Sequence, residues 1–269
     1  MQSNFMVKKL WMVKNLFMVK NLLIVCVGLG LSMTASAQPL EILSFKKNTL
    51  SATEQQQICQ QAQYFCKELK TLRSLKMGTS SLWVMSQHRI VQFQQSNKYW
   101  VKHNEWDFNA PPSKAGEEKN VQHSIFPKLF PLDQNRYAIA YLIERTEGYS
   151  GGGAQIQRAN FIELKQKGQK DEFITDYPFH LSQMIRACFS EEDYKNSEGH
   201  CHDFYNLDLD IRVIKPMLWQ FRYTYETKIS PASDSGEKSV KETKHININL
   251  NQIPKTLAIP EAWNYSGQG

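Results

Sequence analysis

Residues 203–214 read DFYNLDLDIRVI, and their strict alternation is the clearest structural signal in this chain of 269 residues. Polar side chains fill one phase of the alternation, and the other phase holds Leu207, Leu209, Ile211 and Val213. A period of two places successive side chains on opposite faces of a strand, so that one face is buried and the other meets solvent. The stretch therefore predicts a strand of an antiparallel sheet.

Similar patterns extend on both sides of this strand. Residues 219–225 (WQFRYTY) alternate aromatic and polar side chains, and we expect the aromatic stripe to lie in the core. Further strands are predicted at residues 82–93, 98–103, 137–144 and 245–250, and loops at 109–116 and 230–239. Residues 154–165 fit a helix or a strand. Strands in consecutive hairpins with few helices between them predict an α+β, mainly antiparallel β fold.

One helix is predicted before these strands. Residues 51–54 (SATE) form a capping box, and apolar side chains follow at helical spacing, namely Ile58, Ala62, Phe65, Leu69 and Leu72. Gly78 marks its expected end. We expect this N-terminal amphipathic helix to pack on the antiparallel sheet.

Residues 1–37 have the pattern of a secretory signal peptide. Four lysines and no acidic residue precede a short apolar run at residues 22–31, which ends in Ala35-Ser36-Ala37. The run is shorter than the roughly 20 residues of a membrane span, so we expect cleavage after Ala37 and no stable membrane insertion. Residues 38–269 are then a single periplasmic α+β domain. A hexapeptide written three times leaves the start codon open among Met1, Met6, Met12 and Met18.

The charge of the expected mature chain is close to neutral. Four of the 32 basic residues lie in residues 1–37, which leaves 28 basic against 26 acidic residues, a net charge of +2. This balance gives no reason to expect a nucleic-acid partner or an anionic membrane.

Four cysteines remain after residue 37, namely Cys59, Cys66, Cys188 and Cys201. An even number in an exported chain predicts two structural disulfides. In a continuous helix Cys59 and Cys66 would be separated by about 10.5 Å of axial rise, beyond the roughly 7 Å that a disulfide allows between Cα atoms. Either both cysteines reach across to Cys188 and Cys201, or the helix breaks between them. A local bridge from Cys188 to Cys201 is geometrically easy, and the pairing stays open.

Residues 148–152 read GYSGG, which matches the G-x-S-x-G nucleophile elbow of serine hydrolases. An elbow needs a buried strand that runs directly into the first glycine and a helix behind the serine. Here residues 144–147 (ERTE) separate the apolar strand from Gly148, and this polarity favours a hairpin with a wide glycine-rich loop. The loop supplies the predicted binding residues, which are Tyr149, Ser150, Gly151, Gly152 and Gly153. A serine hydrolase with Ser150 as nucleophile, and Asp176 or Asp208 with His245 completing the triad order, is the alternative.

Two other groups of residues have the composition of a site but are expected to be structural or solvated. His200-Cys201-His202-Asp203 has the His-x-His spacing of a metal site but no identifiable third ligand, so we expect structural or surface histidines. Asp208 and Asp210 share one strand face, where carboxylates are most often simply solvated. We expect neither a metal nor a cofactor.

The stretch from Phe126 to Leu164, with FPKLFPL, YAIAYLIE, GYSGGG and NFIEL, resembles small periplasmic immunity proteins such as those of type VI secretion. The resemblance implies binding without catalysis and carries over no residue by position. We therefore expect an exported, soluble, non-enzymatic inhibitor that binds another protein, either a toxic effector or an envelope hydrolase, through the glycine-rich loop.

Overall fold

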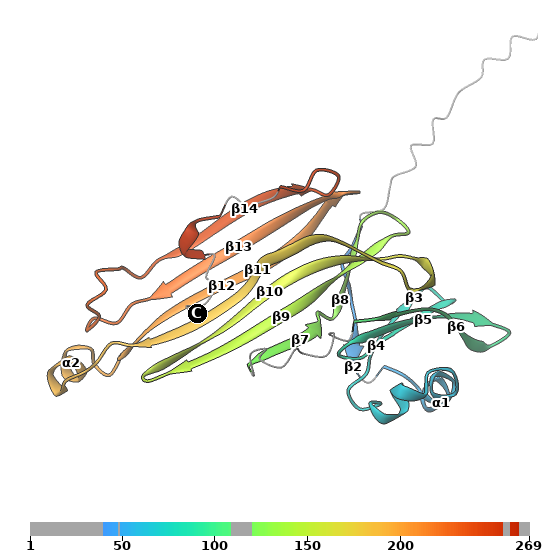
Figure 1. The fold of residues 1–269 in the computed structure, drawn as a ribbon, viewed down its shortest axis with the longest axis horizontal. Coiled ribbons are helices and arrows are strands. Elements are labelled where there is room, and N and C mark those ends of the chain that lie inside the picture. The colour runs from blue at the N-terminus through green and yellow to red at the C-terminus, as the bar shows by residue number, and fades with distance from the viewer. Residues whose placement is uncertain (1–39, 48, 109–119, 255–258, 264–269) are drawn as a thin grey trace, which may run out of the picture. The chain divides into compact units, whose positions relative to one another are not determined.

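The computed structural model describes residues 40–47, 49–108, 120–254 and 259–263. The expected signal peptide over residues 1–37 and the expected loop over residues 109–116 lie outside the described residues. In the part that is described, the chain forms antiparallel β-sheets with few helices, as the sequence predicts (Figure 1).

Nine strands form the larger sheet: β1 (Leu43–Ser44), β7 (Val121–Ile125), β8 (Lys128–Pro131), β9 (Tyr137–Tyr149), β10 (Gly152–Leu164), β11 (Lys170–Arg186), β12 (His202–Lys215), β13 (Leu218–Lys228) and β14 (Lys241–Asn249). Their order is β1-β8-β9-β10-β11-β12-β13-β14, and β7 pairs with β9 beside this path. From β9 to β14 each strand pairs with the next one in the chain, which is the arrangement of consecutive hairpins.

Five strands form the smaller sheet, in the order β2 (Lys46–Lys47), β3 (Arg73–Met77), β4 (Ser81–Met85), β5 (Arg89–Ser96) and β6 (Tyr99–Asp107). The run predicted over residues 82–93 is therefore a hairpin of β4 and β5. The described helices are α1 (Ala52–Gln61), α2 (Glu191–Asn196) and the 3-10 turns Gln63–Lys67, Gln166–Gly168 and Glu261–Trp263.

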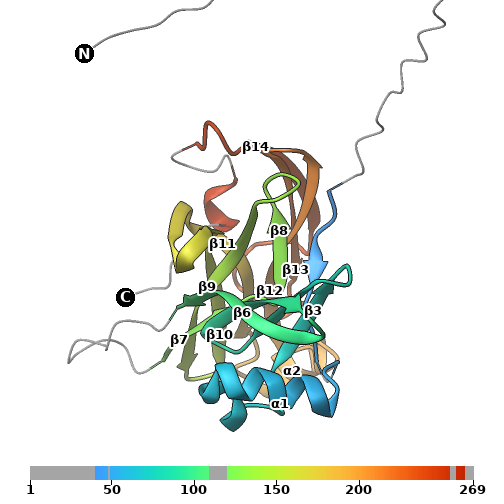
Figure 2. The ribbon, with the colours of Figure 1, turned by 90° about the vertical axis from the view of Figure 1, so that its right-hand side faces the viewer.

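Alternate side chains of β4 are buried in two different hydrophobic clusters. Trp83 and Met85 pack in a cluster that includes Ile139 and Ile162 of the larger sheet, and the Trp83 ring stacks on Trp106 with 5.3 Å between centroids. Leu82 and Val84 face the other way and pack in a cluster with Ile58 of α1. Figure 2 shows α1 lying alongside the smaller sheet. The smaller sheet thus has an apolar layer on each face, because the β4 side chains from Leu82 to Met85 are apolar on both faces.

The aromatic stripe of β13 lies in the core, as the alternation predicts. Trp219, Phe221 and Tyr223 are fully buried, and the Tyr223 hydroxyl donates a 3.0 Å hydrogen bond to the carbonyl oxygen of Pro178. That bond satisfies a polar group that would otherwise be costly to bury.

Helix α1 begins at the predicted capping box and ends far before Gly78. Ser51 accepts the N–H of Glu54, and the Glu54 carboxylate accepts the Ser51 N–H. At Ala62 the backbone leaves the helical region (φ −141°), and a 3-10 turn follows. This break lies between Cys59 and Cys66, which are paired with Cα atoms 5.3 Å apart. Of the two alternatives for these cysteines, the structure has the broken helix.

Candidate binding surface

The glycine-rich segment is a tight hairpin turn rather than a wide loop. Tyr149 and Gly152 are the last paired residues of β9 and β10, so that only Ser150 and Gly151 form the connection. Gly151 has φ +88°, which side-chain-bearing residues rarely adopt. The wide loop predicted from the polarity of residues 144–147 is therefore wrong. These residues continue β9, because its outer part has no apolar layer to cover and tolerates polar side chains on both faces.

Tyr149 is fixed in place by its neighbours on β10 and β11. Its hydroxyl donates a 3.1 Å hydrogen bond to the carbonyl oxygen of Met184 and receives a 3.4 Å hydrogen bond from the Gln183 side chain. The ring crosses Gly152, where an added Cβ would lie 2.5 Å from the ring. Glycine at this position lets the aromatic ring lie on the strand, so that Tyr149 is held while 41% of it stays exposed.

Ser150 does not have the surroundings of a nucleophile elbow, since the strand β10 follows it instead of a helix. The acids and the histidine considered for a triad have other partners. Asp176 pairs with Arg158, Asp208 pairs with His180, and the His245 ring faces Gln220 at 3.4 Å. His180 lies five residues along β11 from Ile185, the partner of Gly152, which is about 17 Å at strand spacing. The structure thus brings none of these groups to the turn.

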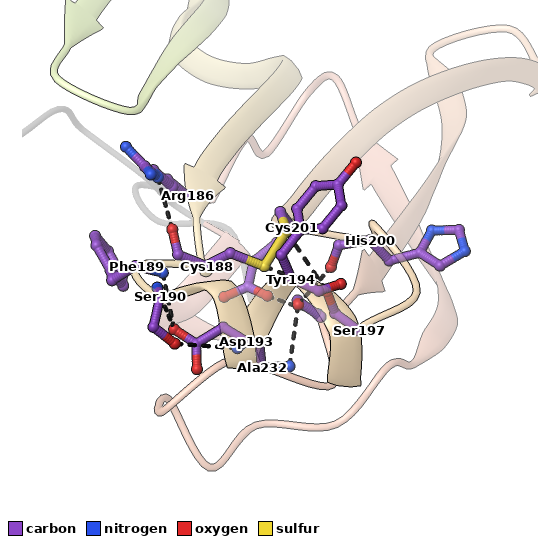
Figure 3. Close-up of a disulfide and its surroundings, with 12 residues drawn as sticks. Arg186, Cys188, Phe189, Ser190, Asp193, Tyr194, Ser197, His200, Cys201 and Ala232 are labelled. Carbon is purple, nitrogen blue, oxygen red and sulfur yellow. Dashed lines mark hydrogen bonds between the residues drawn. A yellow bond between two sulfur atoms is a disulfide. The ribbon is translucent and has the colours of Figure 1, made fainter.

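Residues 188–201, closed by a disulfide and shown in Figure 3, form what we call the disulfide-closed segment. Cys188 and Cys201 are paired with Cα atoms 4.9 Å apart and join the end of β11 to the start of β12. Arg186, the last residue of β11, lies next to the turn, because a Cβ added to Gly151 would be 2.9 Å from the Arg186 Cβ. The pairing of Cys188 with Cys201 is the local alternative considered from the sequence.

Within the disulfide-closed segment, Asp193 organises the start of α2. Its carboxylate accepts the N–H groups of Phe189 at 2.9 Å and Ser190 at 2.8 Å, and the Ser190 hydroxyl accepts the N–H of Asp193 at 3.0 Å. The hydrogen bond from the Phe189 N–H, followed by that from Ser190, lowers the pKa of the Asp193 carboxyl below its usual value. The segment therefore has a defined backbone conformation although most of it is exposed.

Exposed apolar side chains concentrate at this end of the larger sheet. Nine large hydrophobic side chains are exposed in the described part of the chain, and five of them lie here. We call these five the end patch, and they are Tyr149, Met184, Phe189, Tyr194 and Phe204. Phe189 has 76% of its surface exposed, and the Arg186 guanidinium lies 5.5 Å from its ring centroid.

The end patch extends over both faces of the sheet. Met184 and Phe204 are cross-strand partners and so share a face. Tyr149 has Gly152 and then Ile185 opposite it, which places it on the other face. Phe189 and Tyr194 come from the disulfide-closed segment beyond β11. A partner that covers the end of the sheet would contact Met184 and Phe204 on one face, Tyr149 on the other face, and the disulfide-closed segment.

Sequence reasoning missed four members of the end patch. Phe204 could have been recognised from the sequence. It occupies an even-numbered position, as do the polar residues Asn206 and Asp208, and the even-numbered positions of this strand face solvent. Phe189 had a second signal as an aromatic residue directly after a cysteine in an otherwise polar segment. Met184 and Tyr194 carry no such signal. Only the strand register and the disulfide place them beside Tyr149.

The residues at 200–203 serve structure at this end of the sheet. Cys201 is in the disulfide, and Asp203, only 4% exposed, accepts hydrogen bonds from the Ser230 N–H and the Ser233 hydroxyl, both at 2.7 Å. The Ser230 hydroxyl donates to the carbonyl oxygen of His200 at 2.5 Å. In the described residues, no group of three or more His, Cys, Asp or Glu side chains is placed to hold a metal ion.

Asp208 and Asp210 do not act on each other. The Asp208 carboxylate accepts a hydrogen bond from Nδ1 of His180 at 2.8 Å, and Asp210 pairs with Arg222 at 2.8 Å. The Asp208 carboxylate is largely exposed and that of Asp210 is half-exposed. They form cross-strand polar pairs on the outer face of the sheet, which agrees with the solvated role expected from the sequence.

Comparison with known proteins gives no assignment: no family model matches the chain, and no curated protein or solved structure is significantly similar to it. Among the residues that the structure describes, no helix has the length and hydrophobicity to cross a membrane.

Proposed function

We propose that this protein is an exported, non-enzymatic binding protein of the inhibitor or immunity type, and that the end patch contacts its protein partner. The observation that carries the proposal is the concentration of five exposed apolar side chains around one hairpin turn and one disulfide. Monomeric proteins rarely expose large contiguous apolar patches unless these are used in binding.

The anchors of the end patch suit recognition because they are held before a partner arrives. Tyr149 is fixed by its hydrogen bond to Met184, and Phe189 is adjacent to the disulfide at Cys188. Ordering a side chain on binding costs about 0.5–1.5 kcal/mol, and a side chain that is already ordered avoids much of this cost. Aromatic residues are also the ones that most often dominate the affinity of an interface.

An envelope hydrolase is the partner class that we propose. The β9–β10 hairpin ends in a connection of only two residues, flanked by Tyr149 and a run of glycines that bring the backbone close to any contact. Such a narrow turn can enter the concave active site of an enzyme, where inhibition needs only a complementary surface.

The test begins with capture of a secreted hydrolase by the full chain from the envelope of its own or a competing strain. The captured enzyme is then purified, and its inhibition and dissociation constant are measured with Phe189→Ser and Tyr194→Ser. We expect each variant to weaken binding about tenfold or more, as interface anchors do. The matched control is Tyr99→Ser, which removes an equally exposed aromatic ring from the smaller sheet.

Two results would contradict the proposal. One is an inhibition constant that is unchanged in both end-patch variants. The other is covalent labelling of the protein by a fluorophosphonate that disappears in Ser150→Ala, because it would identify Ser150 as a nucleophile.

A further inference from the structure

A cleft of about 600 Å³ lies where the two sheets meet. One side is formed by β2, β3 and the turn between β4 and β5, and the other by the segment from β7 to β8 with Leu142 of β9. Leu142 is seven residues along β9 from Tyr149, or about 24 Å at strand spacing. The cleft is therefore separate from the end patch, and its volume is in the range of small-molecule sites.

Two basic side chains line the cleft side by side. Lys47 and Arg73 are direct cross-strand partners on β2 and β3. Like charges in this position destabilise a sheet. Within the described residues neither has an ion-pair partner, and Glu68, the one acidic residue among those lining the cleft, forms no salt bridge with either. An anion in the cleft would offset this repulsion.

The turn between β4 and β5 gives the cleft a fixed polar wall. It is tied to the rest of the chain by the N–H of Ile125, which donates to the Gln87 carbonyl oxygen at 3.1 Å, and by the N–H of Phe108, which donates to the His88 carbonyl oxygen at 2.7 Å. The Nδ1 atom of His88 is buried with no hydrogen-bond partner in the described part of the chain. A buried polar atom without a partner is unfavourable, and an acceptor group beside the ring would satisfy Nδ1 when that atom carries the proton.

The remaining lining is apolar. Met85 and Leu142 are 4% and 6% exposed, and the half-buried Phe126 lies with Pro127 on the opposite side. These side chains can cover a hydrocarbon or aromatic body but offer no charge. The cleft thus combines one cationic position with an apolar wall, which is the pattern of a site that orients a ligand by a single charged group.

We propose that this cleft binds a small amphipathic anion, with its carboxylate, sulfonate or phosphate group at Lys47 and Arg73 and its apolar body against Met85, Phe126 and Leu142. A guanidinium and an ammonium together match an oxyanion, because the first donates in a planar fork and the second as a point charge. The proposal does not depend on the protein-binding role of the end patch.

The test is a fluorescence titration of the full chain with 1-anilinonaphthalene-8-sulfonate, which has an anionic group on an aromatic body. We expect the double variant K47Q/R73Q to weaken binding about tenfold, because two charge-assisted contacts are lost. The control is Lys46→Gln, which removes one positive charge at the neighbouring position; Lys46 is opposite Ser74 in the strand register and faces the other side of β2. We expect this control to bind like the wild type.

Two further titrations separate the cleft from other apolar surfaces. The neutral probe N-phenyl-1-naphthylamine is expected to bind at least tenfold more weakly than the anionic probe. Octanoate or octyl phosphate should displace the anionic probe, and the more effective of the two identifies the preferred head group, whereas octanol should not displace it. Equal binding by K47Q/R73Q and wild type, equal displacement by octanol, or loss of the signal in Phe189→Ser would overturn the proposal.

Discussion

The Tyr149 hydroxyl donates a hydrogen bond to the carbonyl oxygen of Met184, two strands away, and the tyrosine ring bridges the intervening strand at Gly152. This contact joins the hairpin turn to β11 without any side chain from β10. It explains why a glycine stands at a strand position where glycine is otherwise unfavourable. The end of the sheet is consequently one connected unit rather than a free hairpin.

Gly152→Ala tests this contact. The added Cβ would collide with the Met184 carbonyl oxygen and with the Tyr149 ring, so we expect the free energy of unfolding to fall by about 1–3 kcal/mol, as in other overpacked sites. Urea unfolding followed by circular dichroism measures the change. Gly148→Ala is the matched control, because its added Cβ meets nothing within 4 Å, and it should stay within about 0.5 kcal/mol of wild type. Equal stability of the two variants would show that the ring does not occupy the position over Gly152.

Removing each disulfide should reduce stability according to the length of chain that it closes. The pairs are 13 residues apart for Cys188 and Cys201 and 7 apart for Cys59 and Cys66. Loop-closure entropy then gives losses of about 3 kcal/mol for C188S/C201S and about 2.5 kcal/mol for C59S/C66S. Urea unfolding of the double-serine variants provides the comparison. Peptide mapping of the oxidised protein checks the pairing. A disulfide that joins Cys59 or Cys66 to Cys188 or Cys201 would contradict it.

The lowered pKa of Asp193 predicts a pH-dependent start of α2. Because the folded-state pKa lies below the usual value of 3.8, the carboxylate stabilises the fold fully above that value, and its contribution is lost as the pH falls through the lower folded-state pKa. We expect the amide chemical shifts of Phe189 and Ser190 to titrate with a midpoint below 3.8. The titration should vanish in Asp193→Asn. A midpoint at or above the usual value would mean that the capping hydrogen bonds are absent in solution.

Asp203→Ala tests whether residues 200–203 serve structure. The substitution leaves the buried Ser230 N–H without its acceptor, so we expect a loss of about 2 kcal/mol in the free energy of unfolding. Asp203→Asn keeps an acceptor oxygen and should lose less. Asp210→Ala removes a half-exposed carboxylate paired with Arg222 and serves as the control, with an expected change below about 1 kcal/mol. A larger loss at Asp210 than at Asp203 would contradict this account.

The regular parts of the fold could be predicted from sequence because their strands bury one face and expose the other to solvent. β12 and β13 each have one buried and one solvated face, and their alternation is correspondingly clean. β11 was not predicted, because bulges where it pairs with β10 and a positive φ at Asp176 interrupt its period. The outer part of β9 was missed for a different reason, since polar residues on both faces give no period at all.

The candidate surface could be predicted only in part. Tyr149 and the glycines stood out as a motif, but their partners on β11 and α2 are brought to them by strand register and by the Cys188–Cys201 bridge. The cleft was not predicted from sequence, because Lys47 and Arg73 are unremarkable as single residues. They form a candidate anion site only because the register of β2 and β3 places them opposite each other.

The position of β14 at the end of the strand order has a consequence for how copies of this protein behave at high concentration. A terminal strand presents unpaired backbone groups that can template the addition of a foreign strand. Here that strand reads KETKHININ, and its first half carries three charged side chains, the exposed Lys241 and Glu242 and the half-buried Lys244. A second molecule pairing along this edge would have to cover these charged side chains, which makes edge-to-edge association less favourable.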